Sequence, residues 1–406
     1  MSNTLKFIDM VAREAQAIAH EKSQFIGTVD RQYDDSFAKS GAKIGNALRV
    51  RKANQYVRRQ GSRVMDVQDQ NERVDTITLA TQDGVDMRFN SAELTLDTDN
   101  PKEVAAFSKR YIEPAVCTLI SGIEADFLAY ATKATANVVG TANTAITDLK
   151  APGLARAKLN QGLAPKDGNR FVQMDSITGA YLVDGLKGLF QDSAQIKEQY
   201  REGMIGRTGM ADWYENERVY TLTNSADVAG TLDTYTVTEG DADLTVTGLS
   251  AAPTAGMVFT LAGVYDINPE TKQAYSNLKQ FVVGTGSTTT NIVYSPAIYS
   301  SASGALQNVS ALPATTAAVT FVGDASSSYV QPLMYHKNAF QFVSADLPLF
   351  DGSEKCVRKV QEGISMRFWM DSDIRNDELL LRIDTLYGFA ALRPEWACRM
   401  IGSKAS

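Results

Sequence analysis

The stretch LLLRIDTLYGFAALRPEWACRM, residues Leu379–Met400, lies close to the C-terminal end of the 406-residue chain. Its first part alternates apolar and polar residues with a period of two, which predicts a β-strand buried on one face. The apolar face would carry Leu381, Ile383, Thr385 and Tyr387, and the opposite face Arg382, Asp384 and Leu386. Chain ends usually lose order unless something holds them. A strand this well specified therefore predicts that the C-terminal region packs against a core.

The segments upstream of this strand mix helical and extended patterns. GISMRFWMD (363–371), a polar turn at SDIRND (372–377) and the quoted strand predict an antiparallel hairpin. Residues 3–22 and 101–135 have helical periodicity, and Pro114 is suited to the first turn of the second helix. Residues 145–220 alternate between predicted helix and strand, with LARAKLNQGL and TGAYLVDGLKGLF as helices and RFVQMD as a strand. These patterns favour an α+β protein.

Residues 28–95 are polar and contain two charged blocks of opposite sign. The basic block, residues 49–63, and the acidic block, residues 65–75, are flanked by alternating segments, as in a long two-stranded loop. We expect these charges to pair with each other or with a neighbouring subunit. The candidate contact residues are Arg49, Arg51, Arg58, Arg59, Arg63, Asp66, Asp69 and Glu72.

The composition changes sharply near Thr221, and up to about Gly323 the chain is rich in Thr, Ser, Val, Gly and Ala. Six short alternating runs predict a small β-barrel or sandwich inserted into a loop of another domain. The runs are TYTVT, LTVTGL, MVFTLAGV, LKQFVVG, TNIVYS and AAVTFVG. A turn within this region carries three further candidate contact residues, Glu239, Asp241 and Asp243.

Composition restricts the class of protein further. The length suggests two or three structural units, and 44% apolar and 21% charged residues are ordinary for a globular protein. The net charge of −7 argues against a surface that binds nucleic acid over its whole extent. Three widely spaced cysteines indicate free thiols. We expect no membrane-spanning segment, because no run of about 18 apolar residues stands out, and the first twenty residues lack a signal-peptide pattern.

The residue patterns do not predict an enzyme, a metal site or a cofactor site. His20 and His336 have no His, Cys or carboxylate at ligand spacing, and the glycines of GMIGRTG do not follow the dinucleotide-binding pattern. Two other classes stay open. One is an extracellular β-rich adhesin or surface-layer protein. The other is a nucleic-acid-binding scaffold that uses residues 49–63, although only Tyr56 is available there for base stacking.

Taken in order, these segments resemble the major capsid (coat) proteins of tailed bacteriophages with the Hong Kong 97-type fold, in particular the short-tailed phage (podovirus) subgroup that carries an inserted β domain. The resemblance covers nearly the whole chain. It is carried by GVDMRFNSAELTLD (84–97), YIEPAVCTLISGIEADFLAYA (111–131), NRFVQMDSITGAYLVDGLKGLF (169–190), YREGMIGRTGMADWYENERV (200–219), LAGVYDINPETKQAYSNLKQFVVG (261–284) and RIDTLYGFAALRPEWACRM (382–400). One departure is the 239–243 turn, which is short for the acidic two-fold contact loop of some relatives.

The resemblance implies the following domains: an N-terminal arm (1–33), an extended loop (34–83), a P domain with a spine helix (84–140), an A domain (141–220), an inserted β-barrel (221–330), the A-domain return (331–354) and a C-terminal P-domain hairpin (355–406). It places the final strand beside its hairpin partner and against the spine helix, with Gly388, Ala390 and Ala391 allowing close approach.

The same resemblance implies a function and a set of partners. The chain would self-assemble into the pentamers and hexamers of an icosahedral shell around double-stranded DNA, which it would contact weakly. A scaffolding protein and a portal protein would be its other partners. Assembly would take place in the cytoplasm of the host bacterium, and the protein would end in the virion capsid. In this setting residues 49–63 are better interpreted as a protein–protein element than as a DNA-binding one.

Overall fold

A computed structural model describes residues 23–33, 47–59, 61, 63–65, 67, 74–90, 111–186, 207–208, 210–233, 237–350, 355–361 and 364–404. The helix expected at residues 3–22 lies outside this part of the chain. Contacts group the chain into two units. Unit 1 comprises Met1–Val50, Val74–Phe127 and Phe340–Ala390, and unit 2 comprises Arg51–Arg73, Leu128–Ala339 and Ala391–Ser406.

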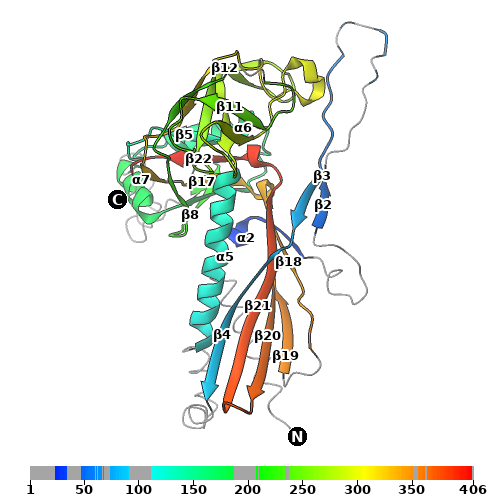
Figure 1. The fold of residues 1–406 in the computed structure, drawn as a ribbon, viewed down its shortest axis with the longest axis vertical. Helices are drawn as coiled ribbons and strands as arrows, with labels where there is room; N and C mark the ends of the chain where they lie inside the picture. The colour runs from blue at the N-terminus through cyan, green and yellow to red at the C-terminus, as the bar shows by residue number, and fades with distance from the viewer. Residues whose placement is uncertain are drawn as a thin grey trace. The chain divides into compact units, whose positions relative to one another are not determined.

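Unit 1 is built on a six-stranded sheet (Figure 1). The strands are β1 (Asp30–Tyr33), β4 (Thr81–Asn90), β18 (Phe340–Ala345), β19 (Lys355–Gln361), β20 (Ile364–Asp373) and β21 (Glu378–Ala391). Strand β21 is antiparallel to β20 over residues 378–384 and to β4 over residues 378–387. The hairpin expected from the sequence is therefore present, and its second strand, β21, pairs with β20, β4 and β18.

The two faces of β21 differ as its alternating pattern predicts. Leu381, Ile383, Thr385 and Tyr387 are each at most 8% exposed, whereas Leu380 and Arg382 on the opposite face are exposed. Asp384 departs from the pattern, because it lies on the polar face and is 0% exposed. Its burial is explained by the ion pairs described below.

Helix α5 (Glu113–Ala134) contacts the apolar face of this sheet through Phe127. Pro114 lies in its first turn, as expected. Phe127 of α5 is at the centre of an aromatic cluster, with ring centroids 5.1 Å from Phe389, 6.0 Å from Phe342 and 4.8 Å from Phe25. Phe25 belongs to α2 (Phe25–Thr28), so α5 brings together an N-terminal and a C-terminal segment.

By length and composition alone, α5 meets the criterion for a membrane-spanning helix. We expected no such segment from the sequence. The 18-residue window that meets this criterion is 56% buried inside the structure. Such burial is what a core helix shows, and α5 packs against its own sheet through Phe127. Its apolar character is therefore accounted for by the core of the protein.

Close approach at Gly388 involves a different segment from the one expected. A Cβ atom at Gly388 would lie 2.4 Å from the carbonyl oxygen of Thr78 and 3.2 Å from the Cα atom of Leu79. Thr78 ends β3 (Val74–Thr78), which forms a two-stranded sheet with β2 (Ala47–Arg51). The glycine thus admits the chain that follows β3, while the helix meets the end of β21 at Ala391, whose N–H donates to Tyr130 Oη.

Unit 2 contains a second six-stranded sheet, which we call the carrier sheet. Its strands are β5 (Val138–Gly140), β6 (Arg170–Met174), β7 (Arg207–Thr208), β8 (Ala211–Glu215), β17 (Leu333–His336) and β22 (Ala397–Ile401). Helices α6 (Lys150–Gln161) and α7 (Ser176–Leu186) accompany it, and Leu159 and Leu182 pack into one core cluster with Met334 and Cys398 of the sheet. Helix, strand and helix therefore occur where the sequence predicts them.

The quoted stretch contributes to both units. Strand β21 ends at Ala391, a short 3₁₀-helix η5 (Pro394–Trp396) follows, and β22 then pairs with β17 and β5 in the carrier sheet. By contacts, residues 391–406 group with unit 2, and the expected assignment of residues 355–406 to one domain stays a prediction. Pro394 is well placed to end β21, because it cannot donate a ladder hydrogen bond.

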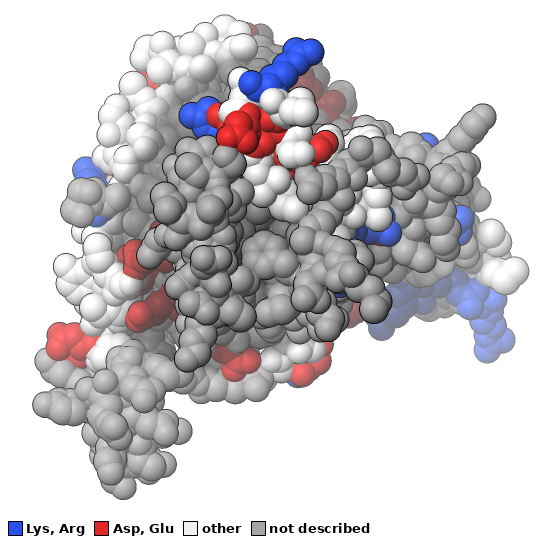
Figure 2. Space-filling model, turned by 90° about the horizontal axis from the view of Figure 1, so that it is seen from below, with Lys and Arg blue, Asp and Glu red and all other residues white. Residues whose placement is uncertain are grey.

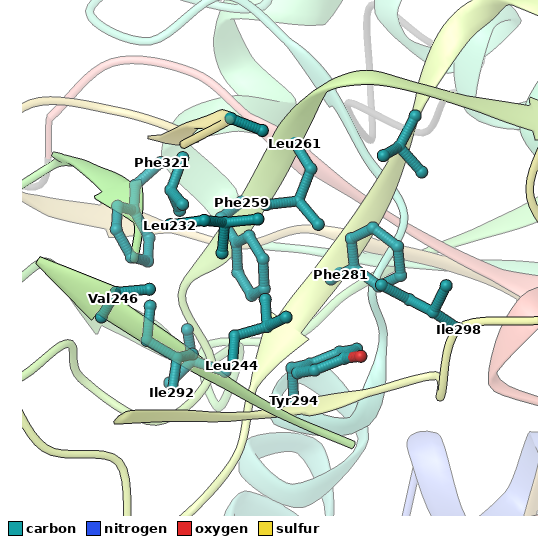
Figure 3. Close-up of a cluster of buried hydrophobic side chains, with 14 of the residues drawn as sticks. Leu232, Leu244, Val246, Phe259, Leu261, Phe281, Ile292, Tyr294, Ile298 and Phe321 are labelled. Carbon is teal, nitrogen blue, oxygen red and sulfur yellow. The ribbon is translucent and has the colours of Figure 1, made fainter. Parts of the chain in front are cut away.

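A closed six-stranded barrel lies in sequence between β8 and β17 of the carrier sheet. Its order is β10-β11-β14-β13-β12-β15, with β10 (Ala229–Leu232), β11 (Asp243–Thr247), β12 (Val258–Ile267), β13 (Ala274–Val283), β14 (Asn291–Ser295) and β15 (Ala318–Phe321). Aromatic and aliphatic side chains fill it (Figure 3), and Phe259 lies within 6.0 Å of the ring centroids of Phe281, Tyr294 and Phe321. The barrel that the sequence predicted is thus observed.

One barrel strand is not where the sequence put it. The run TYTVT was expected to be the first strand, but β10 is formed by the preceding AGTL. Residues 234–236 of the run lie outside the described chain, while Val237 is buried in the barrel core without being in a strand. A Cβ atom at Gly230 would lie 3.2 Å from Leu249 Cδ2, so the glycine gives that side chain room beside β10.

Glu124 is a buried carboxylate that holds the N-terminal segment of unit 1. It is 0% exposed on α5, and its Oε1 atom accepts hydrogen bonds from the backbone N–H of Gln24, at 3.0 Å, and of Phe25. Buried backbone donors are costly to leave unpaired. Glu124 therefore holds α2 against helix α5.

Replacing Glu124 with alanine is expected to lower the free energy of unfolding by about 3 kcal/mol, because the buried N–H of Phe25 and the half-buried N–H of Gln24 lose their acceptor. Glu124→Gln is the matched control, since its side-chain oxygen can still accept both bonds. Urea unfolding followed by tryptophan fluorescence measures both variants. Equal stability of the alanine variant and the wild-type protein would contradict this role of Glu124.

Candidate assembly surfaces

The segment between β2 and β3 carries most of the predicted contact residues. Arg49, Arg51, Arg58, Arg59 and Arg63 are all exposed. Arg59 Nη1 donates to the carbonyl oxygen of Val64 within the segment. Asp66, Asp69 and Glu72 lie outside the described residues, so the expected pairing between the two charged blocks stays a prediction.

Apolar side chains in the same segment are the feature that the sequence reasoning missed. Val64 and Met65 are each 77% exposed and Val67 is 76% exposed, and Tyr56 is 55% exposed. Scattered exposed apolar residues are normal on a monomer, but a contiguous group of them marks an interaction site. The sequence does show valine and methionine between the charged residues of this segment. The prediction of contact residues used only the charged ones.

The three acidic residues of the 239–243 turn are engaged within the barrel. Glu239 accepts hydrogen bonds from Ser300 N at 2.8 Å, from Ser303 Oγ at 2.7 Å and from Ser300 Oγ. Asp241 accepts from Thr238 N at 2.7 Å, and Asp243 is exposed, with Asn291 Nδ2 at 3.5 Å from its carboxylate. Their contacts with other subunits stay a prediction, and Glu239 has a defined role inside the chain.

Burial alone would raise the pKa of Glu239, but the hydrogen bonds from Ser300 and Ser303 together outweigh burial and lower it below 4.5. A carboxyl group whose pKa is lower in the folded state stabilises the fold above its ordinary pKa, and this contribution is lost as pH falls through the folded value. Glu239 thus supports the barrel at neutral pH and ceases to do so in acid.

Glu239→Gln is expected to lower the thermal midpoint of the protein at pH 7 and to have a smaller effect near pH 3, because the wild-type carboxylate takes up its proton as pH falls toward and through its lowered pKa. Thermal unfolding by circular dichroism at the two pH values measures the difference. Asp243→Gln is a matched control on the same turn. A loss of equal size at both pH values would show that the charge of Glu239 is not involved.

The polar face of the unit 1 sheet carries a chain of ion pairs. Arg367 Nη2 lies 2.5 Å from Asp384 Oδ2, and Arg382 Nε lies 2.6 Å from Asp384 Oδ1 and 3.6 Å from Asp86. The Arg367 guanidinium lies 5.5 Å from the ring centroids of both Phe350 and Trp369. These contacts explain the burial of Asp384, because a buried carboxylate is tolerated when it is paired and hydrogen-bonded. The Asp384 hydrogen bond in turn raises the pKa of Arg382.

His336 is buried and hydrogen-bonded within unit 2. It is 1% exposed, its Nε2 atom lies 3.1 Å from Asp167 Oδ1, and the N–H of Asn338 donates to its Nδ1 atom. Hydrogen bonds from Asn169, and then from His336, lower the pKa of Asp167. Within the described ranges there is also no group of three or more His, Cys, Asp or Glu side chains that could hold a metal ion. The contacts of His336 and Asp167 thus hold neighbouring parts of unit 2 together.

Figure 2 shows one face of the molecule, on which acidic and basic side chains of the described residues occur in several places.

A comparison of the sequence with known protein families, taken together with this fold, identifies the chain as a subunit of a viral shell. Residues 49–402 match the family described as P22 coat protein, gene protein 5. The chain belongs to the P22 coat protein family. It is accordingly a major capsid protein of a tailed phage, which confirms the resemblance seen in the sequence; the adhesin alternative is not supported.

Three solved structures illustrate the distance between this chain and characterised capsids. The chain is similar to that of Mycobacterium phage Che8, with 11% identity, a TM-score of 0.47 and coverage of 91% of this chain and 88% of that one. For the bacteriophage PhiM1 mature capsid the values are 11%, 0.46, 93% and 86%, and for the capsid of Ralstonia phage GP4 they are 7%, 0.47, 95% and 92%. No curated protein matches the chain.

Proposed function

We propose that copies of this chain close into an icosahedral shell around double-stranded DNA, and that the β2–β3 loop docks on a neighbouring copy through its apolar residues. The observation that supports this is the exposure of Val64, Met65 and Val67 to 76–77%. Burying a side chain of this size contributes about 1.5–3 kcal/mol, whereas an exposed ion pair contributes about 0.2–1 kcal/mol. The apolar residues would supply most of the contact energy, and the arginines around them would guide its register.

The finer assignments follow from the same proposal. Residues 1–33, 34–83 and 84–140 would act as arm, extended loop and spine-bearing P domain, residues 355–406 would complete that domain, and residues 141–220 with 331–354 would form an A domain that carries the barrel at 221–330. The chain would belong to the short-tailed phage subgroup. It would assemble in the host cytoplasm with a scaffolding protein and a portal protein and would have no catalytic role.

Weak contact with DNA is part of the proposal. The net charge is −7, and each basic contact with a phosphate releases counterions, so affinity would rise steeply with every added contact in a repeating shell. A wall that bound DNA tightly would hinder both packaging and release. The basic block at 49–63 would therefore act between protein chains. Salt-sensitive binding of DNA by the isolated subunit, lost when Arg58 and Arg59 are replaced, would instead favour the nucleic-acid-binding alternative.

Met65→Asp combined with Val67→Asp is expected to leave a folded subunit that forms no shells, because two carboxylates would have to be buried at each copy of the contact. Ala53→Asp with Gln55→Asp adds the same charge at exposed positions of the same segment and is the matched control. Sucrose-gradient sedimentation of co-expressed coat and scaffolding proteins measures shell yield. Wild-type yield from the Met65/Val67 variant would refute this use of the loop.

A further inference from the structure

The barrel rests on the carrier sheet through a set of buried polar contacts, which we call the barrel seat and define as Lys158, Asp266, Lys279, Gln280 and Val138. All five residues lie within unit 2. Asp266 belongs to β12, Lys279 and Gln280 to β13, Lys158 to α6 and Val138 to β5. The seat therefore joins two barrel strands to one helix and one edge strand of the carrier sheet.

One carboxylate serves two lysines at the centre of the seat. Asp266 Oδ1 lies 2.9 Å from Lys279 Nζ, and Asp266 Oδ2 lies 3.8 Å from Lys158 Nζ. The three side chains are only 11–19% exposed. Burial, opposed in part by Asp266, lowers the pKa of Lys158, and Lys279 lowers it further. The other group near Lys158 is Cys398 of β22, whose own pKa is raised to about 12 by burial and which is therefore neutral at pH 7.

The second part of the seat closes the edge of the carrier sheet. Strand β5 pairs with β22 on one side. On its other side the Val138 N–H donates to Gln280 Oε1 at 3.0 Å, and Gln280 Nε2 donates to the Val138 carbonyl oxygen at 2.8 Å. The side-chain amide thus takes the place of a neighbouring strand. An open edge is a template for unwanted pairing, so the barrel also shields β5.

Two further polar contacts reach the barrel from the carrier. Arg399 of β22 is 1% exposed, and its Nη1 atom donates to the Gly256 carbonyl oxygen at 2.8 Å. Gln161 Nε2 of α6 donates to Asn277 Oδ1 at 3.4 Å. The apolar part of the contact includes Val138 and Ile401 of the carrier, which pack against Val258 and Tyr329. The barrel keeps a separate core of its own.

We propose that the barrel seat is a conformational latch: it sets the orientation of the barrel on the carrier sheet, it depends on Asp266, and the barrel keeps its own fold when the seat opens. Buried polar groups add little net stability but require one geometry, because any other leaves charges and donors unpaired. The barrel core does not include the seat residues, so opening the seat leaves it intact. The inference does not depend on shell assembly.

The charge balance predicts unequal effects of two substitutions. Asp266→Asn leaves two buried ammonium groups without a carboxylate and opens the seat. Lys158→Met removes the lysine on the carrier side and leaves the Asp266–Lys279 pair of the barrel at 2.9 Å. No buried charge is then unpaired, so nothing favours opening and the seat stays closed through Gln280 and Val138. The two variants change the same cluster by one charge each, in opposite directions, and are matched controls for one another.

Hydrogen exchange of the full chain, read by mass spectrometry, separates the seat from the barrel core. The reporter of the seat is the Val138 amide, whose acceptor is Gln280. The reporter of the barrel core is the Val283 amide, whose acceptor is Met257. Asp266→Asn is expected to speed exchange at Val138 at least tenfold and to leave Val283 unchanged. Lys158→Met is expected to match the wild-type protein at both amides.

Three results would overturn the proposal: wild-type exchange at Val138 in Asp266→Asn, equal acceleration at Val138 and Val283, or the same opening in Lys158→Met. If Asp266→Asn does not fold, the double variant Asp266→Asn, Lys279→Met leaves a single buried ammonium group, that of Lys158 on the carrier side, without a carboxylate. We expect this variant to fold with Val283 protected and Val138 exchanging at least tenfold faster. Retained protection of Val138 would overturn the proposal there too.

Discussion

Strand β21 is hydrogen-bonded on both sides, to β20 over residues 378–384 and to β4 over residues 378–387. This double pairing constrains the rest of unit 1, because a shift of one residue would exchange the two faces of the strand. In the observed register Ile383 and Tyr387 face the core with Phe127 of the spine helix nearby, and Asp384 meets Arg367 on the other face. The sheet, the helix and the ion pairs therefore depend on one alignment.

The carrier sheet also depends on the C-terminal stretch, here through a buried arginine. The chain leaves β21 at Ala391, turns at Pro394 and enters β22, whose buried Arg399 binds the carbonyl oxygen of Gly256 in the barrel. One continuous stretch thus contributes a strand to the unit 1 sheet and a strand to the carrier sheet, and it also contacts the barrel through Arg399. Its importance for the fold explains why a segment so close to the end of the chain has such a regular sequence.

Much of this architecture was predictable from local pattern. Alternation over residues 379–387 gave the strand and its buried face, and helical periodicity with Pro114 gave the spine helix, because burial on one face leaves a periodic trace. Contacts between distant residues leave no such trace. Glu124 binding the Gln24 and Phe25 amides, Gln280 closing β5 and Thr78 approaching Gly388 each join segments far apart in sequence. For the same reason Asp384 was expected on a solvated face and is buried.

The inter-subunit roles of the predicted contact residues stay predictions. The arginines of 49–63 are exposed as a contact element requires, but Glu239 is engaged by Ser300 and Ser303 within the barrel. A carboxylate in a turn looks the same in sequence whether it faces a neighbour or its own chain. Exposure of Met65 and Val67 is a stronger indication of a contact, because exposing them to water is unfavourable unless a neighbour covers them.

The central claim is that this chain acts by closing into a shell with its own copies. Negative-stain electron microscopy of the purified protein, expressed alone and with the proposed scaffolding partner, is the decisive measurement. We expect closed particles tens of nanometres across, built of rings of five and six subunits, in at least one of the two preparations. Monomers or small oligomers in both preparations, even at high protein concentration, would contradict it.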